Sequence, residues 1–230
     1  MNIRTPRSII QKSAAGLLVV IVIGVLIWWV WRGWRPSVED YPRQGVEVSA
    51  ASGAINWAVV KAGGADFAYI DASFGDEDRN AAFAAQWQES AAAGLTRGAL
   101  HRFHLCRLAR DQATNFIAMV PREADELPPV LGLDLDAGCT ARPARSVMLA
   151  EIESFIKMVE AHVEKPVMIR VSPAFEAEYS ISRAIDRPLW LSSRVFAPSY
   201  GERPWVMWQS NPARPVDGIE KPVGWSVVRP

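Results

Sequence analysis

The stretch "PPVLGLDLDAGC", residues 128–139, places two acidic side chains, Asp134 and Asp136, inside an apolar run. Bounded by prolines and a glycine, the run has the length and composition of a buried strand. Carboxylates are rarely buried unless they are paired or have a chemical role. Because side chains alternate along a strand, both aspartates are predicted to point to one face, with Cα atoms about 6.5–7 Å apart.

Strand-like and helix-like segments alternate on both sides of this stretch. Strands are predicted over 45–51, 67–73, 96–105, 166–172, 188–193 and 204–210, and helices over 78–94, 109–121 and 144–165. The longest helix carries apolar residues at helical spacing, namely Met148, Ile152, Phe155, Ile156 and Val159. This alternation predicts an α/β sheet or barrel of parallel strands, with the active site at their carboxyl ends.

Composition and length narrow the functional classes and the number of domains. The 230 residues include 25 basic and 25 acidic side chains, a balance that gives no electrostatic case for binding nucleic acid. Residues 45–230 suffice for a single domain with a sizeable core. The polar, proline-containing residues 32–44 are predicted to form a linker.

The N-terminal part contains eighteen uncharged residues, 14–31. A helix of this length reaches across a hydrocarbon core of roughly 30 Å, so a transmembrane helix is predicted. The alternative is a cleaved signal peptide, in which an apolar region of about 7–15 residues precedes a small-residue cleavage site. The run instead ends in tryptophans and Arg32, which favours an uncleaved anchor.

Two carboxylates on one face raise each other's pKa, so one can donate a proton while the other stabilises charge. Glycoside hydrolysis uses such a pair. Glu47, in the first predicted strand, would open onto the same barrel mouth. A D-x-D triplet alone also fits a metal site, a sugar-nucleotide transferase or a capped strand end. Because His101 and His104 fall on opposite faces of a strand, no metal is expected, and nothing in the sequence indicates a cofactor.

Several segments, taken in order, resemble glycoside hydrolase family 25, the lysozyme (N-acetylmuramidase) family. "GVEVS…GAINWAVVKAGGADFAYIDAS" is similar to the family's "G-[IV]-D-V-S…G-x-I-D-W…F-A-Y-I-K-A-T-E-G". "AAAGLTRGALHRFHLC" is similar to "A-G-L-x-x-G-A-Y-H-F", and "LPPVLGLDLD" to "L-P-P-V-L-D-L-E". "RPLWLSS" and "PWVMWQS" resemble the late "L-W-[IV]-A" and "W-x-F-W-Q-Y" strands. The resemblance covers residues 45–227.

The resemblance implies an irregular, flattened (β/α) TIM-like barrel that cleaves the β-1,4 bond between N-acetylmuramic acid and N-acetylglucosamine in peptidoglycan. Asp136 falls on the Glu of the family's D-x-E motif, the proton donor. Asp134 falls on its Asp, and Glu47 on the first-strand Asp. The motif is thus D-x-D here, so the sequence leaves open a muramidase of full or reduced activity and a degenerate domain that only binds peptidoglycan. A barrel hydrolase of another polysaccharide is a third alternative.

Further departures from the family pattern are Asp71 for a Lys, Phe74 for a Glu and Gly224 for an acidic residue. Four residues are candidates for substrate binding: Asp71, His101, Trp208 and Gln209. Sugars stack on aromatic faces, and the last two close a late strand. The alternative for His101 is that it fills the barrel.

Cys106 and Cys139 each follow a predicted strand end. A disulfide between them would close a loop of about 34 residues and stabilise the fold by roughly 3–4 kcal/mol; the alternative is two buried thiols. Such a bridge requires an oxidising compartment. Together with a peptidoglycan substrate it predicts a single-pass inner-membrane protein, with residues 1–13 in the cytoplasm and residues 45–230 in the periplasm.

Overall fold

The computed structural model describes residues 6–122, 126–135 and 138–230. It divides into two compact units, one ending at Trp34 and one running from Arg35 to Pro230. The first unit contains helix α1, Pro6–Gly33. Over the described residues, no helix combines the length and the apolar character that a bilayer crossing requires. The transmembrane helix predicted at residues 14–31 is therefore not supported by the structure.

The second unit starts earlier than the sequence predicted. The segment expected to be a free linker up to residue 44 belongs to this unit from Arg35 onward. The reason is the buried side chain of Gln44, which donates hydrogen bonds to the carbonyl oxygens of Pro36 (3.1 Å) and Tyr41 (2.9 Å). These bonds tie the segment to the first strand of the sheet.

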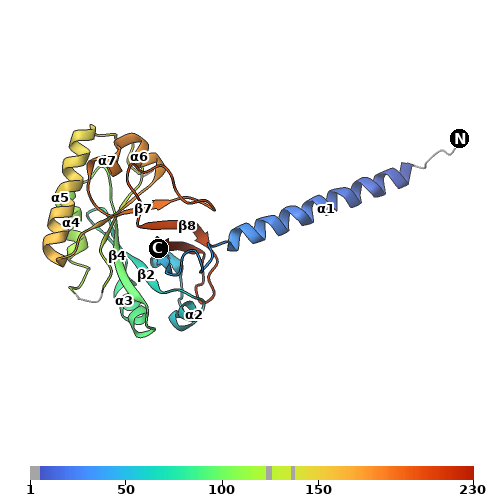
Figure 1. Ribbon diagram of the computed structural model, residues 1–230, viewed down its shortest axis with the longest axis horizontal. Coiled ribbons are helices and arrows are strands. Elements are labelled where there is room, and N and C mark those ends of the chain that lie inside the picture. Colours follow the sequence, from blue (N-terminus) through green and yellow to red (C-terminus); the bar gives the residue numbers. More distant parts are fainter. Residues whose placement is uncertain (1–5, 123–125, 136–137) are drawn as a thin grey trace. The chain divides into compact units, whose positions relative to one another are not determined.

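In the described part of this unit, eight strands form a closed barrel (Figure 1). They are β1 (Gln44–Val48), β2 (Phe67–Phe74), β4 (Thr96–Arg102), β5 (Val130–Leu133), β6 (Met168–Val171), β7 (Leu189–Ser192), β8 (Met207–Arg214) and β9 (Val223–Val228). The seven barrel strands other than β9 pair in parallel around the ring. Strand β9 runs antiparallel to both β8 and β1 and closes it. The predicted α/β barrel is confirmed, and the antiparallel strand makes it irregular.

The barrel interior is filled by a layer of large side chains. Its buried members are Phe67, Tyr69, Leu100, Val130, Met168, Trp190 and Met207. They come from β2, β4, β5, β6, β7 and β8, one or two from each strand. Burying such side chains is worth roughly 1.5–3 kcal/mol each, which makes this layer a main source of stability.

Helices cover the outside of the barrel (Figure 1). They are α2 (Trp57–Ala62), α3 (Phe83–Ala92), α4 (Ala109–Ile117), α5 (Arg145–Val163), α6 (Pro173–Tyr179) and α7 (Ile181–Ala184). Helices α4 and α5 lie side by side. All five apolar residues that predicted the buried face of α5 are buried.

The prediction missed α2, α6, α7, β3 (Asp78–Arg79) and β9, and it placed the start of one helix too early. The helix expected from residue 78 begins at Phe83, because β3 forms a short strand against the end of β2. The side chain of Asn80 stabilises this turn by accepting a hydrogen bond from the Ala82 backbone nitrogen (2.9 Å). Strand β9 was not predicted, since its glycine and serine interrupt the apolar pattern.

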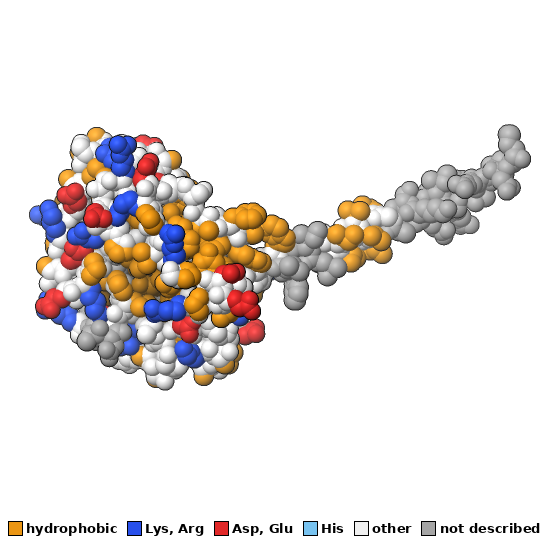
Figure 2. Space-filling view, viewed as in Figure 1, with side chains coloured by type: hydrophobic (Ala, Val, Ile, Leu, Met, Phe, Trp, Pro, Cys, Tyr) orange, Lys and Arg blue, Asp and Glu red, His pale blue; other side chains and the backbone are white. Residues whose placement is uncertain are grey.

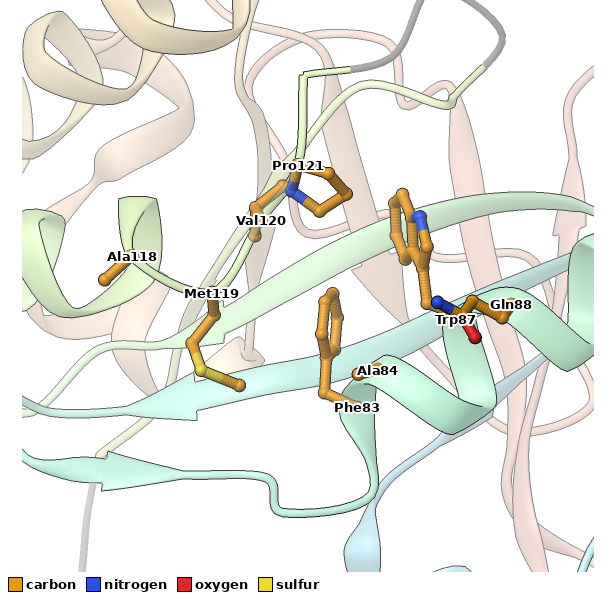
Figure 3. Close-up of a pocket in the computed structure, with 8 residues that line it drawn as sticks. All are labelled: Phe83, Ala84, Trp87, Gln88, Ala118, Met119, Val120 and Pro121. Carbon is orange, nitrogen blue, oxygen red and sulfur yellow. The ribbon is translucent and has the colours of Figure 1, made fainter.

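The surface of the barrel unit in Figure 2 has a mixed character. Figure 2 shows charged side chains of both signs scattered among apolar ones on the visible face. Outside the barrel, a pocket of about 370 Å³ lies between α3 and the segment after α4 (Figure 3). Phe83, Trp87 and Met119 line it, and its described lining holds no ionisable side chain. It therefore lacks the groups that bond cleavage needs.

Candidate active site

Charged side chains gather at the carboxyl ends of the parallel strands, which we call the barrel mouth. They are Glu47 on β1, Asp71 on β2, Arg102 on β4, Asp134 directly after β5 and Arg170 on β6. Asp71, Arg102 and Arg170 each lie two residues beyond a member of the interior layer. Alternation along a strand keeps them on the inner side of the barrel.

Glu47 is held by three donors from three different strands. Its Oε2 accepts hydrogen bonds from Arg170 Nη1 (2.5 Å) and Gln209 Nε2 (2.7 Å). Its Oε1 accepts one from the Ser226 hydroxyl (2.7 Å). Because both oxygens are engaged and the side chain is buried, this carboxylate has a fixed orientation in the mouth.

The space for this long side chain comes from Gly224, which lies directly opposite Glu47 on β9. A Cβ atom added at Gly224 would lie 2.9 Å from the carboxyl carbon of Glu47. Real Cβ atoms do not approach that closely, so the glycine is required for Glu47 to occupy its observed place. The two departures from the family pattern at positions 47 and 224 are thus one structural feature.

Arg170 connects Glu47 to a second carboxylate. Its Nη2 lies 3.7 Å from Oδ2 of Asp134, whose side chain is 52% exposed. Since one guanidinium group reaches both, the two carboxylates lie within roughly 9 Å of each other, inside the range that glycosidases use. Burial alone would lower the pKa of Arg170, but Glu47, Asp71 and Asp134 outweigh it, so the pKa is raised.

Asp71 is the carboxyl group of the mouth with a clearly shifted pKa. Burial raises the pKa of Asp71 to about 6, opposed by the positive charges of Arg170 and Arg102 and reinforced by the negative charge of Glu47. A carboxyl group with such a pKa exchanges its proton near neutral pH, as acid–base catalysis requires.

A pocket of about 230 Å³ opens beside these charges. Asp71 and Arg102 form part of its wall, together with Phe74 and the short segment after β1. The Arg102 guanidinium lies over the Phe74 ring, 5.6 Å from its centroid. The pocket therefore borders the mouth on the side of β2 and β4.

Comparison with known proteins supports a family assignment. Glycosyl hydrolases family 25 matches residues 46–219. The uncharacterized protein YegX of Escherichia coli K12 is 29% identical over 199 residues, covering 82% of this chain and 70% of YegX. Lysozyme M1 of Streptomyces globisporus is 28% identical over 195 residues, covering 76% of this chain and 64% of that protein.

Solved structures with a similar fold support the same family assignment. A family 25 glycosyl hydrolase from Bacillus anthracis superposes with a TM-score of 0.79 at 27% identity, covering 85% of this chain and 92% of that one. A bacterial lysozyme from Streptomyces coelicolor gives 0.76 at 26% identity, covering 82% and 92%. The chain belongs to glycosyl hydrolase family 25. The resemblance inferred from its sequence motifs is confirmed, and with it membership of a family of lysozyme-like glycosidases.

Within this family 25 barrel, the structure brings four of the seven predicted site residues together. Glu47, Asp71, Asp134 and Gln209 lie in the mouth. Asp136, the predicted proton donor, lies outside the described residues. His101 and Trp208 are placed elsewhere.

His101 faces outward from the barrel and is fully buried. Its ring stacks on Phe155 of α5 (4.8 Å between centroids), and its nitrogens bond Ser73 and Gln112. Burial lowers the pKa of His101 to about 4, against a weaker opposing effect of its hydrogen bond to Gln112. It is a neutral packing residue that lies between β4 and the helices and not inside the barrel, where the alternative for this position placed it, because β4 turns it toward the helices.

Trp208 also faces away from the mouth. It is buried, with its ring edge-on to Tyr41 (5.6 Å) and its Nε1 donating to the Ser193 carbonyl oxygen (2.7 Å). The neighbouring Met207 and Gln209 point inward, so Trp208 must point outward. This orientation gives no support to the prediction that Trp208 contacts substrate.

Sequence reasoning missed Arg102, Arg170 and Ser226. Arg170 carried the same signal as Asp134, a charge in an apolar strand segment, "PVMIRVS". Only the pairing of β5 with β6 shows that these two charges meet.

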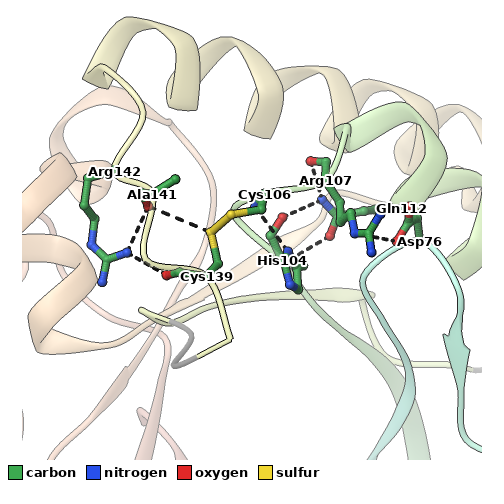
Figure 4. Close-up of a disulfide and its surroundings, with 8 residues drawn as sticks. All are labelled: Asp76, His104, Cys106, Arg107, Gln112, Cys139, Ala141 and Arg142. Atoms are coloured by element: carbon green, nitrogen blue, oxygen red, sulfur yellow. Dashed lines mark hydrogen bonds and ion pairs between the residues drawn. A yellow bond between two sulfur atoms is a disulfide. The ribbon is translucent and has the colours of Figure 1, made fainter.

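The predicted disulfide between Cys106 and Cys139 is present (Figure 4). It links the segment after β4 to the segment after β5 and thus closes the loop that follows Asp134. A ring nitrogen of His104 and the two sulfurs lie within 4.8 Å of one another. In the disulfide neither sulfur is a thiolate, so these atoms are not a metal-ligand set as they stand.

Proposed function

We propose that the barrel is a muramidase that hydrolyses the β-1,4 bond between N-acetylmuramic acid and N-acetylglucosamine in peptidoglycan. The observation that carries the proposal is the convergence of Glu47, Asp71 and Asp134 around Arg170 at the mouth of a family 25 barrel. The similarity to lysozyme M1 supports this substrate. No cofactor is part of the proposal.

We assign the proton-donating role to Asp136, which occupies the place of the family's motif Glu. Asp134 and Glu47 stabilise the positive charge that develops on the sugar or on its N-acetyl group. Asp136 is one methylene shorter than Glu, and a displacement of about 1 Å can cost on the order of 100-fold in rate. Reduced activity is therefore part of the proposal.

The test is release of soluble muropeptides from purified peptidoglycan by residues 35–230, a compact unit, between about pH 4 and 8. Asp136→Asn should abolish release. Asp186→Asn is the matched control, because that carboxylate precedes β7 at the other end of the barrel and its side chain is 97% exposed. Product masses identify the bond cleaved. No release at any pH would contradict hydrolysis, and products of other masses would indicate another polysaccharide.

A second candidate function is peptidoglycan binding without turnover. It is favoured by the locked state of Glu47, whose two oxygens already accept hydrogen bonds from the protein. In that case the unit would pellet with insoluble peptidoglycan and release nothing. Measurable turnover, or failure to pellet, would exclude it.

For location, we propose that helix α1 attaches the chain to the inner membrane, with the barrel in the periplasm. Support comes from the uncharged residues 14–31, the exposed apolar side chains of Leu17, Ile21 and Val25, and the disulfide, which needs an oxidising compartment. The full chain should remain in the membrane fraction after alkaline carbonate extraction, and the barrel should be digested by protease added to spheroplasts. Release into the soluble fraction would contradict attachment, and protection from protease would contradict the periplasmic location.

A further inference from the structure

One arginine connects the carboxylates of the barrel mouth. Arg170 lies 2.5 Å from Glu47 and 3.7 Å from Asp134 through its two terminal nitrogens. Its guanidinium also lies over the Trp190 ring, 5.6 Å from the centroid. With a side chain only 17% exposed, its charge is balanced mainly by these carboxylates rather than by water.

We propose that Arg170 is a positioning residue, whose guanidinium group orients Asp134 in the mouth and balances the negative charge of Glu47 and Asp134. This inference rests on the proposed hydrolysis, because a reaction that develops positive charge on a sugar depends on where its carboxylates stand. Arg170 acts through these carboxylates, not by contact with substrate.

The contacts divide unequally between the two partners. Glu47 keeps two further donors, Gln209 and Ser226. The side chain of Asp134 is half exposed. Its ion pair with Arg170 is the described contact that orients it. Loss of Arg170 should therefore free Asp134 while Glu47 stays in place, so a variant at this position is expected to fold.

Arg170 also affects a third carboxyl group that it does not contact closely. Its charge opposes the effect of burial on the pKa of Asp71. The other charged or titratable groups facing this part of the mouth are Glu47 on β1, Arg102 on β4, Asp134 after β5 and Tyr200 between β7 and β8. With Arg170 removed, Arg102 is the one cation among the described residues that still lowers the pKa of Asp71, so this pKa should rise further.

The experiment compares Arg170→Gln and Arg170→Lys with Arg187→Gln. Arg187 is the matched control, because it pairs with Glu160 at 2.6 Å on the outside of the barrel. For each variant, muropeptide release is measured against pH, and the carboxyl carbon of Asp71 is titrated by NMR. The NMR titration does not require turnover.

Arg170→Gln should lower kcat by about 100-fold with a small change in KM, and should move the pH profile and the Asp71 midpoint upward by about one unit. Arg170→Lys keeps the charge but not the fork, so it should restore the pH values and only part of kcat. Arg187→Gln should change neither.

A purely structural role would lower thermal stability alone. If Arg170→Gln leaves the pH profile and the Asp71 midpoint where they are in the wild type, the proposal is overturned. If the wild type releases no muropeptides, the proposed hydrolysis fails, and the Asp71 midpoints of the same variants still decide the charge-balancing role of Arg170.

Discussion

On several strands the interior layer and the mouth of the barrel lie two residues apart. On β2, Tyr69 belongs to the interior layer, and two residues later Asp71 lies in the mouth. On β6, Met168 and Arg170 have the same relation. A step of two residues keeps the side chain on the same face of the strand. Chemistry and stability are therefore separated along the barrel axis, and substitutions in the two layers should have separable effects.

The largest effect is expected from the interior layer. Trp190 is fully buried there, so Trp190→Ala should lower the free energy of unfolding by about 3–5 kcal/mol, as emptied aromatic sites do. Urea denaturation of residues 35–230 measures it. Phe196→Ala is the control, because that side chain is 76% exposed and should cost little. Equal losses would show that the interior layer is not the source of stability.

The next largest effect concerns the pH dependence of stability, to which a residue of the mouth and a packing residue contribute with opposite signs. Burial favours the neutral form of both Asp71 and His101, with pKa values of about 6 and about 4 in the folded chain. The raised pKa of Asp71 makes stability fall as pH rises from about 4 to 6, because the folded state binds more protons there. The lowered pKa of His101 makes stability rise as pH rises from about 4 to 6.5.

These two contributions, each up to about 3 kcal/mol, nearly cancel in the wild type. Asp71→Asn should make the protein more stable above pH 6 and should reduce activity. Its stability should then rise with pH, because the contribution of His101 is no longer cancelled. In His101→Gln, stability should instead fall as pH rises, because the contribution of Asp71 is no longer cancelled. Thermal melts across pH 4–7 measure both. If neither variant changes the pH dependence of the melting temperature relative to the wild type, the assigned protonation states are contradicted.

The comparison of the two layers also shows what could be predicted from the sequence. Hydrophobic periodicity predicted every barrel strand except β9, and it predicted α5, because each of these elements buries an apolar face. Acids in apolar strands predicted Glu47 and Asp134. The sequence could not tell that β4 turns His101 outward, nor that Arg170 meets Asp134, because strand pairing determines both. Arg102, at the end of a strand, had the pattern of an ordinary solvated charge.

The smallest effect tests the coupling of β1 to β9 in the mouth. Gly224→Ala would place a Cβ atom 2.9 Å from Oε1 and from the carboxyl carbon of Glu47. Glu47 must then shift and weaken its bonds to Ser226 and Arg170. Overpacking of this kind costs about 1–3 kcal/mol, and we expect the lower end because the mouth is partly open to solvent. Muropeptide release should fall at the same time.

A double-mutant cycle with Glu47→Asp identifies the clash. The shorter side chain withdraws from position 224, so Gly224→Ala should cost less in the Glu47→Asp background than in the wild type. A coupling energy of about 0.5 kcal/mol or more is expected for residues in contact. Additive losses would mean that the carboxyl end of Glu47 is not the source of the clash, which would then lie with the Cβ atom of residue 47, 3.0 Å away, or with the β9 backbone. A clear coupling would show that the long acid on β1 and the missing side chain on β9 together define the mouth.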